Sequence, residues 1–203
     1  MLIDLSVAIN NDTPVYPGDP VVQIKPAGIL SKDGFNDHLL SIGTHVGTHI
    51  DAPMHMFDGG KTLDQYPLEH FMGRGRYIRI ENGQFSIDAV KNADIQEGDV
   101  VIFHTGFGDD YDNPDRYFKQ YPAIPADIAQ YLVEKEIKMV GTDTCSPDYP
   151  DFPIHKIFLA GDVLILENLT NIEEVAGKEF KIMAFPLKLE IDASPVRVVA
   201  EVV

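Results

Sequence analysis

The sequence has little of what several classes of protein require. Only 16 of its 203 residues are Lys or Arg, against 32 that are Asp or Glu, which gives a formal net charge of −16 with histidine neutral. Such a chain lacks the basic surface that would attract nucleic acid or an anionic membrane. We therefore expect neither as a partner. The one cysteine, Cys145, cannot form a disulfide within the chain. We therefore expect a reducing, cytoplasmic location.

Long apolar runs and a basic N-terminal region are also missing. No stretch approaches the roughly 18 residues of a membrane span, so no transmembrane segment is expected. The first residues, MLIDLSVAINND, carry no Lys or Arg and are interrupted by Asp4, so we expect no signal peptide. The sequence also has no repeat, low-complexity tract or linker, and its length suits a single domain over residues 1–203.

The segments that are present predict an α/β fold with a mixed sheet and flanking helices. Strand-like segments, apolar or β-branched and bounded by Gly, Asp or Pro, outnumber helical ones. The clearest helical pattern places Ile128, Tyr131 and Leu132 at i, i+3 and i+4. The predicted strands cover residues 2–9, 21–25, 38–50, 76–80, 100–104, 139–141, 163–167 and 181–187, and the predicted helices cover 67–72, 87–92, 115–120, 126–138 and 155–160.

Three of the seven histidines fall in one eleven-residue window. His45, His49 and His55 share it with Asp51, and all four have odd numbers, whereas apolar residues such as Ile50 take the even positions. In extended chain the imidazoles and the carboxylate would therefore lie on one side of the backbone. We therefore favour a metal site over the alternative that these histidines are only solvated or hydrogen-bonded to neighbours.

A straight strand would separate His45 from His49 by about 13 Å, at roughly 3.3 Å per residue. One metal ion needs its nitrogen ligands at about 2.1 Å, so the chain must curl, and Gly43, Gly47 and Pro53 permit this. Imidazoles together with a carboxylate suit zinc, or manganese, iron or cobalt in a site richer in oxygen.

The position of His55 beyond the Pro53 bend predicts a different role for it. A free imidazole beside the ion can take or donate a proton, so we expect His55 to be catalytic and not a ligand. A metal site that the protein closes completely would instead indicate a non-catalytic metal-binding protein. A third alternative is a structural α/β domain whose histidines bind nothing.

The window H-x-G-T-H-x-D-x-P-x-H, from His45 to His55, resembles the signature of the metal-dependent cyclase/hydrolase family that includes bacterial kynurenine formamidase and isatin hydrolase. The resemblance covers nearly the whole chain. Its other segments, in order, are Asp4-Leu5-Ser6, Tyr16-Pro17-Gly18-Asp19, Thr105-Gly106, Asp143 through Ser146-Pro147-Asp148, and Glu167-Asn168-Leu169.

The resemblance implies a fold of the swivelling β/β/α kind, a homodimer or homotetramer, and zinc as one or two ions, with manganese as the alternative. It also implies roles for particular residues. His45, His49 and Asp51 would bind metal, and His55 would be the general acid/base. Binuclear members add a histidine and a glutamate twelve residues apart, and His155 and Glu167 have that spacing.

The expected activity is hydrolysis of amide-type C–N bonds in a small molecule, an aromatic amide or lactam, by metal-activated water. Arylformamidase activity of the kynurenine formamidase type ranks first, with isatin-type lactam or cyclic imide hydrolysis as the alternative. In kynurenine-type members a Trp commonly precedes Pro-Gly-Asp, where this chain has Tyr16. Tyr16 and Phe35 are the candidate substrate-binding residues. We expect His104 to be satisfied by neighbours and Cys145 to be no nucleophile.

Overall fold

A mixed nine-stranded sheet, in the order β1-β11-β9-β5-β6-β7-β8-β4-β10, forms the centre of the computed structural model, which describes residues 1–203. A separate two-stranded hairpin joins β2 to β3. The strands are β1 (Leu2–Asp4), β2 (Gln23–Gly28), β3 (Asp37–Ser41), β4 (His49–Asp51), β5 (Met72–Arg79), β6 (Val100–His104), β7 (Met139–Thr142), β8 (Leu164–Glu167), β9 (Phe180–Met183), β10 (Ala193–Pro195) and β11 (Val199–Val202).

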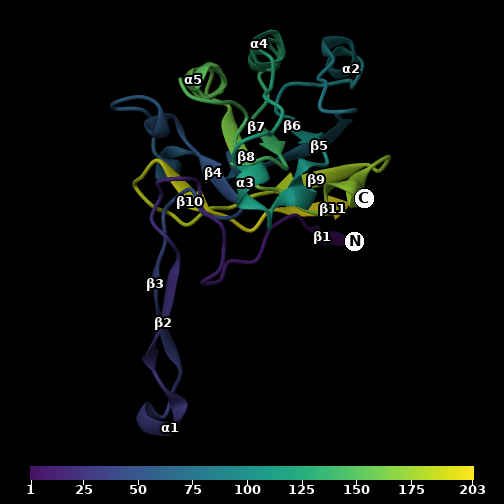
Figure 1. Ribbon diagram of the computed structural model, residues 1–203. Helices are drawn as coiled ribbons and strands as arrows, with labels where there is room; N and C mark the ends of the chain where they lie inside the picture. The colour runs from purple at the N-terminus through teal and green to yellow at the C-terminus, as the bar shows by residue number, and fades with distance from the viewer.

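Five α-helices accompany the sheet: α1 (Leu30–Asp33), α2 (Ile87–Lys91), α3 (Pro114–Tyr117), α4 (Ala126–Glu134) and α5 (Pro153–Ala160). Figure 1 shows α2, α4 and α5 on one face of strands β5 to β8. Short 3₁₀ turns complete the connections: η1 (Pro53–His55), η2 (Leu63–Gln65), η3 (Leu68–Phe71), η4 (Phe107–Asp110) and η5 (Ile172–Val175). None of the helices has the length and hydropathy that a membrane span requires.

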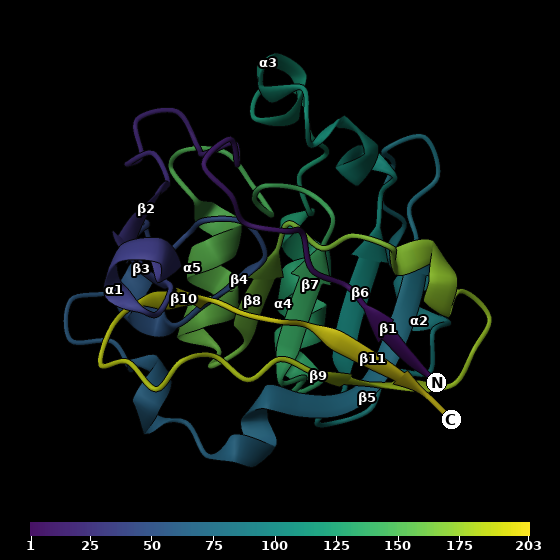
Figure 2. The ribbon, with the colours of Figure 1, turned by 90° about the horizontal axis from the view of Figure 1, so that it is seen from below.

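Alternate side chains of the parallel strands β5 to β8 pack into two apolar cores, one on each face of the sheet. On β6, Val101 and Phe103 pack into the core beneath the helices, while Val100 and Ile102 face the opposite core. That opposite core is closed by β9, β11 and β1, which lie on the far side of the parallel strands in Figures 1 and 2. Period-two patterning thus specifies two buried faces of one sheet.

Strand β5 is where the sheet curls. Its first part, Met72–Arg74, pairs with β9, and its second part, from Gly75, pairs with β6. A Cβ at position 75 would lie 1.9 Å from the Phe180 ring. Only glycine fits this close approach between the two halves of the sheet.

Several predicted boundaries differ from the observed ones. The predicted strand 38–50 is two strands, β3 and β4, separated by a turn, and of 2–9 only Leu2–Asp4 is a strand. The segment 67–72 is a 3₁₀ turn that leads into β5. Helix α4 ends at Glu134, before the predicted 138, and α5 begins at Pro153, two residues before the predicted start. The predicted α/β class, a mixed sheet with flanking helices, is confirmed.

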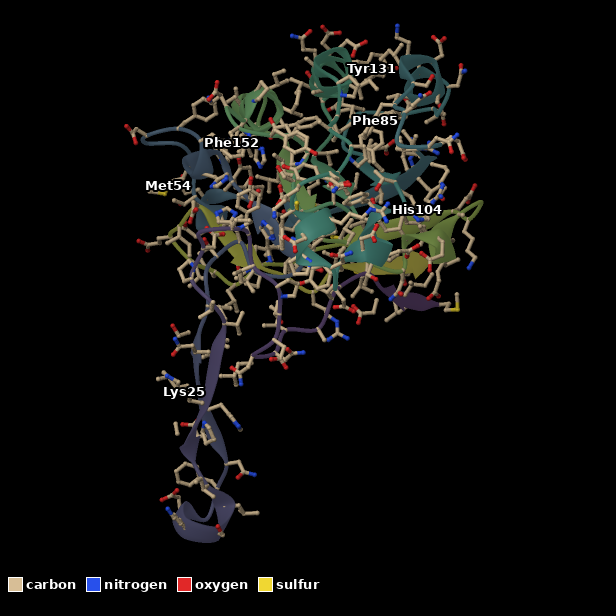
Figure 3. All side chains as sticks on the ribbon, viewed as in Figure 1. Lys25, Met54, Phe85, His104, Tyr131 and Phe152 are labelled. Atoms are coloured by element: carbon tan, nitrogen blue, oxygen red, sulfur yellow. The ribbon has the colours of Figure 1, made fainter.

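The β2–β3 hairpin, with α1 at its tip, extends away from the rest of the molecule, and we call it the arm (Figure 1). Figure 3 shows Lys25 on the arm, clear of the body. Every residue of β3 is exposed. The arm also presents large apolar side chains to solvent: Ile29, Leu30, Phe35, Leu39 and Leu40.

Candidate metal centre

The pairing of β4 with β8 forms the floor of the site. In this antiparallel pair His49 lies opposite Glu167, Ile50 opposite Leu166, and Asp51 opposite Ile165. Ile50 and Leu166 belong to the core closed by β9 and β11, so His49, Asp51 and Glu167 point to the other face, beneath α5. All three are buried. The parity that the sequence predicted for His49 and Asp51 is confirmed.

His45 joins this group because the chain turns sharply before β4. Gly47 has φ of 62°, in the left-handed region that glycine adopts without strain. A Cβ there would also come within 3.0 Å of Ile9. The turn brings His45 Nδ1 to 2.9 Å from Asp51 Oδ1, so the predicted curl of the chain is confirmed.

His155 comes from the first turn of α5, which Pro153 begins at a position where no N–H partner is needed. Its Nε2 lies 3.2 Å from Glu167 Oε1 and 3.8 Å from Asp51 Oδ2. The histidine and glutamate whose twelve-residue spacing suggested a pair are therefore neighbours.

His55 returns to the site at the end of the 3₁₀ turn η1, whose first residue is Pro53. Its ring centroid lies 4.1 Å from that of His45 and 5.6 Å from that of His155. One possible ligand group comprises His45, Asp51 and His55, and a second comprises His49, Asp51 and Glu167, with the ligand atoms of each group within 4.8 Å of one another. His55 thus lies close enough to be a ligand, a possibility that the sequence reasoning set aside.

Several buried polar atoms at the centre have no hydrogen-bond partner. They are Nε2 of His49, both carboxylate oxygens of Asp51 and Oε1 of Glu167. The short nitrogen–oxygen separations among these residues do not have hydrogen-bond directions. Leaving one such group buried and unpaired costs about 1–3 kcal/mol, and more for a charged group. Unpaired imidazole and carboxylate atoms that converge on one point fit a divalent cation.

The carboxylates dominate the electrostatics of the centre. Burial disfavours the charged form of His45, but the charge of Asp51 and the bond to Asp192 raise the pKa of His45 to about 11. His155 follows the same pattern: burial opposes protonation, and its contacts with Asp148 and Glu167 raise its pKa to about 10. Burial also opposes ionisation of Asp51, but its histidine neighbours hold the pKa of that carboxyl well below the usual range. The site therefore attracts positive charge.

Each of the three histidines that face the centre has its other ring nitrogen occupied. Nδ1 of His49 lies 2.9 Å from the carbonyl oxygen of Gly47, and Nδ1 of His155 lies 2.7 Å from Asp148 Oδ1. Nε2 of His45 lies 2.9 Å from Asp192 Oδ2. Metal-binding histidines in proteins commonly have such outer acceptors, which fix the tautomer and the ring orientation.

Sequence reasoning identified neither of these two aspartates as a site residue. Asp148 belongs to the segment that carried the family resemblance, and it precedes His155 by only seven residues, so a local signal was available. Asp192 is 147 residues from His45, and nothing near it in the sequence indicates its contact.

A cavity of about 420 Å³ opens above the centre. It is lined by aromatic and apolar residues, among them Tyr16, Phe118, Phe152 and Met56, and by five residues of the centre: His45, Asp51, His55, His155 and Glu167. Tyr16 therefore lies where a substrate contact was predicted. Phe35 is not part of this wall: it is 57 % exposed and lies on the arm.

His104 and Cys145 have the surroundings expected of them. His104 lies outside the cavity, far from Phe152 in Figure 3, with Tyr77 Oη 2.8 Å from its Nδ1 and Arg79 Nη1 2.8 Å from its Nε2. Cys145 lines the cavity wall, and burial raises the pKa of its thiol, which opposes a nucleophilic thiolate.

Relatives of known sequence match nearly the whole chain. Kynurenine formamidase from Salinibacter ruber is 32 % identical over 206 residues, which cover 98 % of this chain and 96 % of the relative. Kynurenine formamidase from Bacillus cereus is 32 % identical, with 97 % and 95 % covered. An uncharacterised protein from Methanocaldococcus jannaschii is 33 % identical, with 98 % of each chain covered.

Solved structures agree with these matches. A potential metal-dependent hydrolase with cyclase activity superposes with a TM-score of 0.82 at 31 % identity, covering 98 % of this chain and 96 % of that one. An isatin hydrolase bound to the product analogue thioisatinate gives a TM-score of 0.88 at 21 % identity, covering 100 % and 92 %, which shows a shared fold.

The profile of one sequence family also matches. It is described as putative cyclase and aligns with residues 3–149, which include the whole histidine window. The resemblance inferred from the motif is thereby confirmed, and this chain belongs to the putative cyclase family.

Proposed function

We propose that the chain is a metal-dependent hydrolase of amide-type C–N bonds. The observation that carries the proposal is the set of unpaired, buried imidazole and carboxylate atoms beneath an open cavity. A site closed completely by protein would favour a non-catalytic metal-binding protein, whereas this one borders a space large enough for a small molecule. Relatives named as hydrolases support the same conclusion.

The residues fit one or two divalent cations. His45, His49 and Asp51 would hold one ion, and the neighbouring pair His155 and Glu167 would hold a second. Two or three imidazoles with carboxylates suit zinc, and manganese is the alternative. When bound, such a cation activates water at neutral pH and polarises an amide carbonyl.

His55 would carry the proton. Its ring lines the cavity, and the carboxylate oxygen nearest to its Nδ1, Asp192 Oδ2, is 3.6 Å away, beyond hydrogen-bond distance. With no hydrogen bond inside the chain, the imidazole can accept a proton and deliver it to the departing nitrogen. General acid/base catalysis by a positioned side chain typically raises the rate by about 10²- to 10⁴-fold.

An arylformamide is the proposed substrate class. Tyr16, Phe118 and Phe152 give the cavity aromatic walls on which a planar ring can stack. The relatives named kynurenine formamidase support an N-formyl aromatic amide. The shared fold with an isatin hydrolase supports a lactam or cyclic imide as the second candidate.

We further propose that residues 1–203 are one domain, because strands of a single sheet contribute side chains to both apolar cores. A homodimer or homotetramer is proposed from the family, and the exposed apolar side chains of the arm support it. The free, buried Cys145 is consistent with the proposed cytoplasmic location.

A substrate screen tests the proposed activity. The purified protein is stripped of metal, supplied with Zn²⁺ or Mn²⁺ in turn, and assayed with N-formylkynurenine, isatin and hydantoin. We expect metal-dependent hydrolysis of the formamide. Turnover of isatin or hydantoin alone would favour the second candidate, and metal binding without any hydrolysis would favour a non-catalytic metal-binding protein.

A further inference from the structure

Asp192 lies where the C-terminal part of the chain meets the metal centre. It immediately precedes β10, whose Ala193 pairs with Asp51 of β4. Its carbonyl oxygen accepts the N–H of Ala52 at 2.8 Å. The backbone at Asp192 is therefore fixed to the end of the strand that carries two of the candidate ligands.

The carboxylate of Asp192 lies beside two histidines. Oδ2 lies 2.9 Å from His45 Nε2, within hydrogen-bond distance, and 3.6 Å from His55 Nδ1. The opposite nitrogen of His45, Nδ1, faces Asp51 Oδ1 at 2.9 Å. His45 thus stands between an outer carboxylate and the carboxylate at the centre.

The other two histidines of the centre show what this arrangement does. His155 donates its outer N–H to a carboxylate, Asp148, and His49 donates its own to the carbonyl of Gly47. A neutral imidazole that donates from one nitrogen has its lone pair on the other. In each case the outer acceptor therefore turns the lone pair toward Asp51 and Glu167.

We propose that Asp192 is a positioning residue for His45. It holds His45 in the Nε2–H tautomer, so that the Nδ1 lone pair faces the cation site. This inference rests on the metal assignment of the proposed function.

A structural ion pair is the competing explanation of the same contact. Asp192 is partly exposed, with 32 % of its side chain accessible, and an exposed pair contributes little to stability. An ion pair that only stabilises the fold would change the free energy of unfolding and leave metal affinity and tautomer as they are. The two explanations therefore predict different measurements.

The test uses Asp192→Ala and Asp192→Asn in the full chain, with Glu190→Gln as the matched control. Glu190 is an exposed carboxylate two residues away, so its substitution removes the same charge without a contact to histidine. Zn²⁺ affinity is measured by competition with a chelator. We expect Asp192→Ala to bind Zn²⁺ about 10- to 100-fold more weakly than the control. Asp192→Asn, whose amide oxygen can still accept from Nε2, should lie between them.

Side-chain ¹⁵N NMR of the zinc-loaded protein gives the second readout. The wild type should show an Nε2–H resonance of His45 that exchanges slowly with water because Asp192 accepts from it. This resonance should be broadened or lost in Asp192→Ala and shifted in Asp192→Asn. If Asp192→Ala does not fold, the asparagine variant alone decides the question. Zn²⁺ affinity and a His45 spectrum equal to those of Glu190→Gln would overturn the inference. Failure of the wild type to bind Zn²⁺ would instead overturn the proposed function.

Discussion

The chemistry that we propose depends at the residue scale on two kinds of histidine in one short window. His45 and His49 face carboxylates at the centre, whereas His55 lies beside the centre without a hydrogen bond. Burial lowers the pKa of His55, which keeps its imidazole neutral and able to accept a proton near pH 7. Loss of His55 should therefore affect proton transfer and leave the cation in place.

We predict that His55→Ala retains bound metal and loses about 10²- to 10⁴-fold in kcat, the range typical of a general acid/base. Metal content is measured by elemental analysis and kcat with the best substrate of the screen. His104→Ala, a histidine outside the cavity, is the control and should keep its activity. Unchanged turnover in His55→Ala would remove this residue from the mechanism.

How far the site could be predicted also depends on particular residues. The candidate ligands His45, His49 and Asp51 are close in sequence, so parity and glycine positions were enough to group them. Glu167 depends on the register of β4 against β8, which only the folded sheet determines. Asp192 meets His45 across 147 residues, and no local pattern encodes that contact.

At the scale of single elements, a cluster of ion pairs joins Arg74 and Arg76 of strand β5 to Asp99, the residue before β6. The carboxylate of Asp99 accepts from Nε and Nη2 of Arg74, each at 2.9 Å, and from Nε of Arg76 at 3.2 Å. The N–H of Gln96 donates to it as well, at 2.9 Å. Burial opposes ionisation of Asp99, but these bonds hold its pKa below the ordinary value of 3.8.

This shift predicts a pH dependence of stability. A carboxyl whose folded pKa is lowered stabilises the fold above its unfolded pKa, and the contribution is lost as pH falls through the folded pKa. Asp99→Asn should therefore be less stable than the wild type at pH 7, by about 1–3 kcal/mol, and the difference should shrink below about pH 4.

Urea unfolding at a series of pH values measures this difference, with the exposed Asp58→Asn as the control. A gap between Asp99→Asn and the wild type that stayed constant from pH 7 to pH 3 would contradict the assignment.

The elements also show where sequence patterns were insufficient. The run 38–50 was predicted as one strand, yet its first part is an exposed arm strand and its last part a buried strand of the main sheet. Leu39 and Leu40 have the composition of core residues, and sequence alone does not distinguish a core strand from an exposed apolar one. The central strands β6, β7 and β8 were predicted closely because they are continuous apolar runs, as strands buried on both faces must be.

At the scale of the whole molecule, the arm is the feature that a single chain leaves unexplained. Leu39 is 63 % exposed and Leu40 54 %, on a hairpin that contacts little of its own body. Contiguous exposed apolar surface commonly marks an interface. In sequence, the arm connects the segment around Tyr16 to the segment around His45, and both of these segments line the cavity.

We predict that the wild type sediments as a multiple of the 22.6 kDa chain and that Leu39→Glu shifts it to a smaller species. A charge at the centre of an apolar contact is costly to bury. Analytical ultracentrifugation measures the masses. Leu187→Glu, which is 65 % exposed and outside the arm, is the control. A monomeric wild type, or the same assembly in Leu39→Glu, would argue against the arm as the interface.

The central claim is that the buried cluster around Asp51 holds a divalent cation. Isothermal titration calorimetry of Zn²⁺ into the metal-free protein tests it most directly, with Asp51→Asn measured in parallel. We predict saturation at one or two ions per chain for the wild type and loss of specific binding in Asp51→Asn, because both candidate ligand groups include that carboxylate. The absence of stoichiometric binding in the wild type, or equal binding in the two proteins, would contradict the account.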